Sequence, residues 1–152
     1  MPTIRNAALL LAVTLTLAIG CKAQTPSAPA QPAALSTLTV QVTGLSDARG
    51  KVLLTLFRDG SPVDRRAVEI DAKTLTASCV FDKLPQGAYA VYLLQDTNGT
   101  GQMEYDSVGM PTKGYGMSNN PAKRPGRPDF DETNFKLDKP EMAIEVKMIY
   151  WP

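Results

Sequence analysis

The residues with the clearest potential for chemistry lie at alternate positions of one polar segment. The segment presents oxygen-bearing side chains at Asp96, Asn98, Thr100, Gln102, Glu104 and Asp106. This spacing is typical of calcium-binding loops, because a hard cation takes several oxygen ligands and a glycine, here Gly101, lets the chain turn around it. Calcium is therefore the one cofactor that the residue pattern suggests.

Two features of the same segment favour a simpler interpretation. An EF-hand loop has a bidentate glutamate at its twelfth position, and that position is Ser107 in this sequence. No helical pattern flanks the segment, and Asp, Asn and Gly also build turns by capping their own backbone. We favour such a turn between strands. A calcium site with a geometry different from the EF-hand is the alternative.

A second segment with binding chemistry follows Gly114. It carries Tyr115, Met117, Ser118, Asn119 and Asn120. An aromatic ring beside amide groups suits sugars and peptides alike, so these residues form a candidate ligand-binding loop. In the alternative, which we favour, the glycines take positive φ and Tyr115 packs down as a lid on the domain.

The choice of catalytic mechanisms is narrowed by the absence of histidine from the sequence. Ser-His-Asp and Cys-His catalysis and the usual zinc sites that contain histidine are impossible. Neither is there a glycine-rich nucleotide motif between a strand and a helix. We therefore expect a protein that is not an enzyme. The alternative is an envelope hydrolase that uses loop carboxylates such as Glu104 and Asp106 as acid and base.

Charged residues of both signs gather in the same region. The basic residues Lys113, Lys123, Arg124 and Arg127 are followed by the acidic residues Asp129, Asp131 and Glu132. We expect these groups to pair with one another on a solvated loop.

The N-terminus indicates export. Residues 1–20 contain a single charge, Arg5, followed by a short apolar run, which is the pattern of a signal peptide. Residues 17–21 resemble the bacterial lipobox, so we expect Cys21 to be lipidated and to anchor the protein in the cell envelope. Lys22 favours the outer membrane. The alternative is cleavage after Ala23, which would give a soluble periplasmic or secreted protein.

Residues 21–36 are rich in Pro, Ala and Ser and predict a flexible tether between the anchor and the domain. The chain has 16 basic and 15 acidic residues, and loss of residues 1–20 with Arg5 leaves a net charge of zero. We therefore expect no nucleic-acid partner, and contact with the membrane through the lipid anchor alone. The oligomeric state has no signal in the sequence.

From residue 37 onward, outside residues 97–132, hydrophobic side chains recur at every second position in several segments, which predicts strands. The strands are expected at residues 37–43, 51–58, 67–70, 75–81, 89–95, 135–137 and 142–150. About seven short strands separated by turns favour an all-β, antiparallel β-sandwich of the immunoglobulin-like or transthyretin-like kind. Tyr89, which follows a Pro-Gln-Gly turn, is placed to pin a corner of the sandwich with its hydroxyl.

The segment from residue 97 to residue 132 has no sustained strand pattern and is rich in glycine and proline. Loops of this length are uncommon in compact domains unless they carry function. Any binding site is therefore expected on this loop face. We expect an envelope protein or a glycan as the partner.

Three sequence blocks are familiar together. They are Leu84–Val91, Asp96–Met103 and Val108–Asn120, and the likeness continues at Gly126–Phe130 and Phe135. The pattern resembles an uncharacterised bacterial family, domain of unknown function 2141, over roughly residues 38–150. The sequence departs from that family at two positions. Gln95 stands where the family often has histidine, and Thr100 stands where it often has asparagine. The resemblance implies an exported, sandwich-like domain without an established activity.

Overall fold

The computed structural model describes residues 35–124 and 128–152, and over these ranges the chain forms eight strands and one short helix. The elements are β1 (Leu35–Thr43), β2 (Lys51–Arg58), β3 (Ser61–Glu69), β4 (Ala77–Pro85), β5 (Gly87–Asp96), β6 (Tyr115–Met117), α1 (Phe130–Thr133), β7 (Phe135–Leu137) and β8 (Glu141–Lys147). The predicted signal peptide, Cys21 and most of the predicted tether lie outside the described residues.

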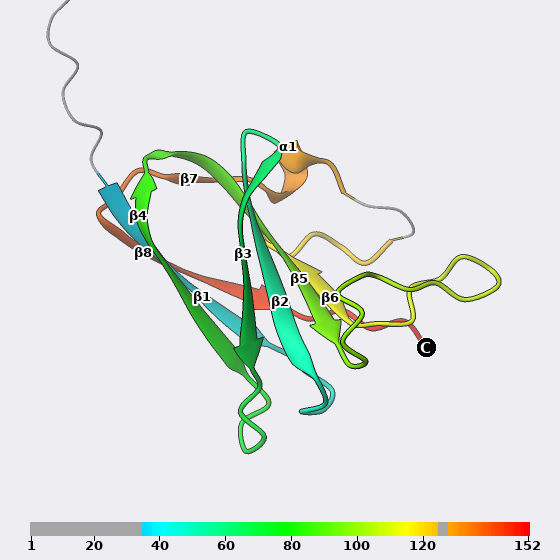
Figure 1. Cartoon of the computed structure of the whole chain (residues 1–152). Helices are drawn as coiled ribbons and strands as arrows, with labels where there is room; N and C mark the ends of the chain where they lie inside the picture. The colour runs from blue at the N-terminus through cyan, green and yellow to red at the C-terminus, as the bar shows by residue number, and fades with distance from the viewer. Residues whose placement is uncertain (1–34, 125–127) are drawn as a thin grey trace, which may run out of the picture. The chain divides into compact units, whose positions relative to one another are not determined.

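The strands form two sheets that make a β-sandwich, as the sequence predicts (Figure 1). The smaller sheet has the order β4-β1-β8, and the larger has the order β3-β2-β5-β6, with β7 also paired to β5. The prediction of purely antiparallel pairing is wrong for one pair, because β1 and β8 run parallel. Since β8 reaches the smaller sheet from β7 of the other sheet and not through a hairpin from β1, its direction is not fixed by a tight turn.

The core lies between the sheets and follows the period of two. Alternate side chains of each strand point to opposite faces, so one set from each long strand is buried. The inward residues include Leu38, Val40 and Val42 of β1, Val52, Leu54 and Leu56 of β2, Ala77, Cys79 and Phe81 of β4, and Val91 and Leu93 of β5. Cys79 is thus a small apolar core residue, as its strand position predicts, and burial raises the pKa of its thiol.

The predicted corner is present at Tyr89. This side chain is almost fully buried, and its hydroxyl donates a hydrogen bond of 2.7 Å to the carbonyl oxygen of Pro85. The bond closes the turn between β4 and β5. It thereby fixes the start of β5, the strand on which the candidate site is built.

Several elements differ from the prediction, among them β4 at Ala77–Pro85 and β8 at Glu141–Lys147, where residues 75–81 and 142–150 were expected. β1 begins at Leu35, so the last two residues of the predicted tether belong to the domain. β3 begins at Ser61 and not near residue 67. The prediction missed its first half because this half is polar. β3 lies at the edge of the sheet, where polar residues prevent association with other strands. β6 was not expected, because it lies within residues 97–132, which show no sustained strand pattern.

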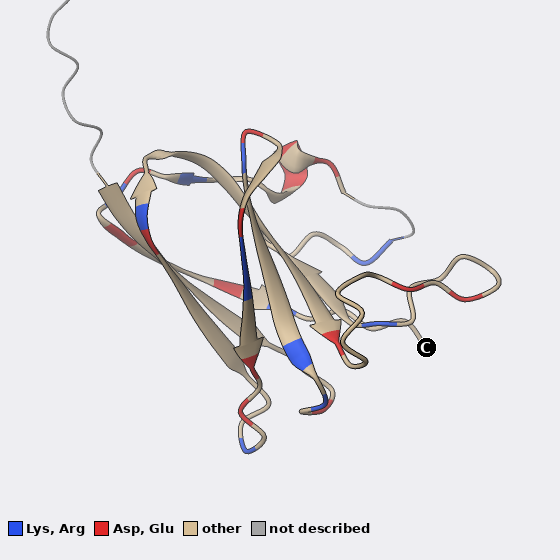
Figure 2. Cartoon of the chain, in the orientation of Figure 1, with Lys and Arg blue, Asp and Glu red and all other residues tan. Residues whose placement is uncertain are grey.

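Within residues 35–124 and 128–152 the structure contains no helix long and apolar enough to cross a bilayer. Basic and acidic residues are mixed along the same strands and loops, as Figure 2 shows.

Candidate functional site

The connection between β5 and β6, residues 97–114, is ordered by its own hydrogen bonds. Its outer part is a small hairpin, in which Tyr105 pairs with Pro111. At the tip, the Asp106 carboxylate accepts bonds of 3.0 and 2.8 Å from the backbone N–H groups of Val108 and Met110. Asp106 therefore caps the hairpin, in the manner of an Asx turn.

The inner part of the connection is organised around one buried cation, the ammonium group of Lys113. Five oxygens surround its Nζ: Asp96 Oδ1 at 2.9 Å, Asn98 Oδ1 at 2.5 Å, Thr100 Oγ1 at 2.6 Å, the Gln102 carbonyl at 3.0 Å and, as an ion pair, Glu104 Oε1 at 3.1 Å. The Lys113 side chain is 3% exposed. We call these five oxygens the oxygen cage.

The cage is held together by further bonds. Asp96 Oδ2 accepts from the N–H of Gly101 at 2.9 Å, where a φ of 70° lets the chain turn back. Glu104 Oε1 accepts from the Asn98 amide at 2.8 Å and lies 2.9 Å from Thr100 Oγ1. Arg65 of β3 donates to the Gly101 carbonyl at 2.5 Å and ties the cage to the edge of the larger sheet.

The charges of the cage shift one another's pKa values. Hydrogen bonding to Lys113 is the main reason that the pKa of Asp96 is lowered, and bonds from Asn98, Thr100 and Lys113 lower the pKa of Glu104. Burial by itself lowers the pKa of Lys113, but the two carboxylates more than offset it, so this pKa is raised. The three groups are therefore charged together at neutral pH.

This arrangement bears on two of the predictions. Of the six residues at alternate positions, five contribute an oxygen to the cage, with Gln102 using its backbone carbonyl, and Asp106 stays outside it. The expected place of Lys113 among solvated charges is wrong, whereas Arg124 and Glu132 do pair at 2.6 Å. No cluster of three or more His, Cys, Asp or Glu residues able to hold a metal is found in the part of the chain that the structure describes. Calcium binding stays an untested alternative to the turn.

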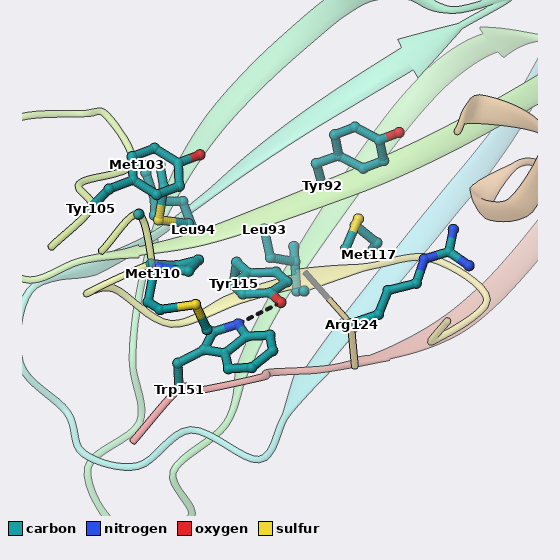
Figure 3. A pocket seen from close by; sticks show the side chains of 13 residues that line it. Tyr92, Leu93, Leu94, Met103, Tyr105, Met110, Tyr115, Met117, Arg124 and Trp151 are labelled. Carbon is teal, nitrogen blue, oxygen red and sulfur yellow. Dashed lines mark hydrogen bonds between the residues drawn. The ribbon is translucent and has the colours of Figure 1, made fainter. Parts of the chain in front are cut away.

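A concavity lies next to this connection, on the outer face of the larger sheet. Tyr92 and Leu94 of β5 stand opposite Met117 and Tyr115 of β6 in the register, so all four side chains share the face turned away from the core. The pocket has a volume of about 380 Å³. Its walls are Tyr92, Leu93, Leu94, Met103, Tyr105, Gly109, Met110, Pro111, Tyr115, Gly116, Met117, Arg124 and Trp151 (Figure 3).

Aromatic rings and methionines dominate the pocket. Figure 3 shows the Tyr115 ring between Trp151 on one side and the β5 residues on the other, with Met103 and Tyr105 at one end and Met117 and Arg124 at the other. The ammonium group of Lys123 lies over the Trp151 ring, 4.3 Å from the ring centre. Such walls suit an apolar guest, with few polar groups to fix its orientation.

The predicted ligand-binding loop is divided by the structure into two parts. Tyr115 and Met117 line the pocket. The other three residues make hydrogen bonds to the backbone of neighbouring segments: Ser118 to Val91 and Thr133, Asn119 to Asn134, and Asn120 to Glu145 and Lys147. These three therefore join β6 to β5, to the segment around α1 and to β8.

Most of the pocket residues were not found from the sequence. Trp151, Tyr92, Met103 and Met110 come from separate stretches of the chain, and only the pairing of β5 with β6 and the return of the hairpin bring them together. The one available signal was local. Aromatic and methionine residues are frequent in the segment that already stood out for its length.

The fold and the pocket define a β-sandwich domain with an aromatic and methionine-lined concavity on one sheet face. The sequence model of a family of uncharacterised proteins conserved in bacteria, domain of unknown function 2141, matches residues 40–145, so this chain belongs to that family. Neither a curated protein nor a solved structure gives a significant match to the chain.

Proposed function

We propose that the domain is a non-catalytic binding module of the bacterial cell envelope. Its partner is an envelope protein that inserts an apolar side chain into the pocket beside Tyr115. In this proposal, lipidation at Cys21 holds the module on the outer membrane, and the residues before β1 act as a spacer.

The composition of the pocket is the observation that carries the proposal. Met103, Met110 and Met117 are flexible and polarisable, and methionines of this kind are frequent on surfaces that bind protein segments. On the hairpin, Tyr105 of the pocket wall and Val108, next to Gly109 of that wall, expose 63% and 79% of their surface. Apolar side chains beside an apolar pocket mark a surface for protein contact. A glycan would need more polar groups directed into the pocket.

The loop carboxylates support a binding role over hydrolysis. Glu104 accepts hydrogen bonds from inside the oxygen cage, and Asp106 caps the hairpin tip. A general acid or base must reach a substrate within hydrogen-bonding distance. Both groups are already used to hold the connection together.

Photo-crosslinking in the producing bacterium tests the proposal. A photoreactive residue is placed at Val108, next to Gly109 of the pocket wall, and as a matched control at Val63 of β3, which is also exposed, at 53%. We expect a discrete adduct with one envelope protein from position 108 and none from position 63.

The same experiment can reject the proposal. Equal labelling from both positions, or no protein adduct from position 108, would exclude a protein partner at the hairpin that carries Val108. Binding of the purified domain to envelope glycans, lost on Trp151→Ala, would then assign the pocket to a glycan.

A further inference from the structure

The oxygen cage has the order of ligands that a calcium loop has. Counting Asp96 as position 1, side-chain oxygens come from positions 1, 3 and 5, and the backbone carbonyl comes from position 7. Position 9 is Glu104, and the turn glycine stands at position 6. The EF-hand loop uses the same positions in the same way, including the carbonyl at position 7.

The centre of the cage is taken by the chain's own cation. An ammonium group has three N–H donors, and here five oxygens surround it at 2.5 to 3.1 Å. Calcium needs similar oxygens at slightly shorter distances, about 2.3 to 2.6 Å. The cage therefore has the chemistry of a calcium site but contains a fixed positive charge.

We propose that Lys113 replaces a calcium ion, so that this loop is closed by an internal ammonium group and does not need a metal. The inference does not depend on the proposed function. The segment is a turn between strands, and its oxygens bind a cation from the same chain. Both the turn and the calcium loop therefore fit the sequence pattern.

The position of Lys113 makes the proposal specific. The lysine lies just before β6 and reaches the cage from outside the run that forms it. A glutamate at this position would place its carboxylate oxygens about one bond short of Nζ, which leaves space for an ion at the centre. Lys113→Glu would then give a site with three carboxylates, as calcium prefers.

The closed cage also shapes the pocket. Tyr105 and Met110 lie on the stretch of chain between Glu104 of the cage and Lys113, and Met103 lies between two cage residues, Gln102 and Glu104. Because the cage joins the two ends of this stretch, its closure sets where this wall of the pocket stands. The wall is therefore in place at any calcium concentration.

Calorimetry and thermal unfolding of the purified domain test this. The wild-type domain, Lys113→Gln, Lys113→Glu and the control Lys139→Glu, at an exposed lysine, are measured with millimolar calcium and with a chelator. We expect no heat of calcium binding and no shift in Tm for the wild type or the control. Lys113→Gln should lower Tm by about 10 °C, since it leaves buried carboxylate charge without a partner.

Lys113→Glu provides the decisive comparison. We expect it to be the least stable variant in chelator and to regain roughly 10 °C when calcium is about a hundredfold above its Kd. If it folds only with calcium present, the proposal is equally supported. Calcium binding by the wild-type domain, or a Tm of Lys113→Gln equal to that of the control, would overturn the proposal. So would a Lys113→Glu domain that folds without responding to calcium.

Discussion

The indole Nε1 of Trp151 donates a hydrogen bond of 2.9 Å to the phenol oxygen of Tyr115. Trp151 follows β8, whereas Tyr115 begins β6, so the bond joins two segments of the chain at the pocket. The backbones of Tyr115 and Ile149 add two more hydrogen bonds, of 2.6 and 3.0 Å. The two rings therefore form one wall of the pocket, and its position depends on the segment after β8.

Removal of the Tyr115 hydroxyl should loosen this wall. We expect Tyr115→Phe to cost about 1 kcal/mol in the free energy of unfolding, the usual net value of one hydrogen bond. Trp151 is the only tryptophan in the chain, so its fluorescence reports on this wall alone. Acrylamide should quench it more efficiently in Tyr115→Phe and equally well in the control Tyr105→Phe. Unchanged quenching would show that the bond does not hold the indole in place.

Gln95 should be a major determinant of stability. Its buried side-chain nitrogen lies 3.1 Å from each of three acceptors, the Asp47 carbonyl, the Asp47 carboxylate and the Arg49 carbonyl, and its oxygen accepts from the Tyr150 hydroxyl at 2.5 Å. Gln95→Leu removes these hydrogen bonds from a buried position and should cost about 3 kcal/mol in urea unfolding. The control Gln41→Leu, at an exposed position of β1, should change stability by less than about 0.5 kcal/mol. Equal effects would contradict the role of Gln95.

Asn120 should act as a structural residue and not as a ligand contact. Its side-chain oxygen accepts from the N–H of Lys147 at 2.7 Å, and its amide donates to the Glu145 carbonyl at 3.1 Å, which ties β6 to the edge of β8. Asn120→Ala removes both bonds and places alanine at a φ of 47°, so we expect a loss of about 2 kcal/mol. If the variant is as stable as the wild type but binds the partner less well, Asn120 contacts the partner and is not a structural residue.

The oxygen cage should make stability depend on acid pH. The pKa values of Asp96 and Glu104 in the folded domain lie below the ordinary values of 3.8 and 4.5. Their contribution is therefore complete above about pH 5 and is lost as the pH falls through the folded pKa values. The hydrogen bond to Lys113 is the main cause of the lowered pKa of Asp96. Lys113→Gln should therefore lose less stability between about pH 5 and pH 3 than the wild type does.

Asp47 and Asp71 provide the background for that comparison. Their pKa values are also lowered, by Arg49 and by the Lys73 backbone respectively, and neither group touches the cage. Their share of the acid dependence should be the same in wild type and in Lys113→Gln. Urea unfolding of both proteins across this pH range therefore measures the contribution of the cage. If the free energy of unfolding falls equally with pH in both proteins, Lys113 does not set the acid dependence.

The sequence predicted those parts of the fold that depend on local periodicity. β1, β2 and β4 alternate between buried and more exposed positions, and β5 is a mostly buried apolar run, so their positions could be predicted. The start of β3 could not, because an edge strand buries little surface. The parallel pairing of β1 with β8 depends on where the chain crosses between the sheets, which no local pattern encodes.

The same distinction holds for the candidate site. The alternate oxygens from Asp96 to Glu104 are a local pattern, and the sequence showed that they could surround a cation. The cation itself is remote in sequence, because Lys113 returns to the cage only after the Tyr105–Pro111 hairpin. Trp151 reaches the pocket through the pairing of Ile149 with Tyr115, which is again a contact between distant residues.

The most direct test of the pocket as the binding site repeats the crosslinking at Val108 in a chain with Met110→Glu. Met110 lines the pocket and is partly exposed, so the charged side chain can be accommodated while it makes the pocket unfavourable for an apolar guest. We predict that the protein adduct falls at least tenfold while Tm changes by less than about 3 °C. An adduct of undiminished yield from a folded Met110→Glu domain would show that the partner does not use this pocket.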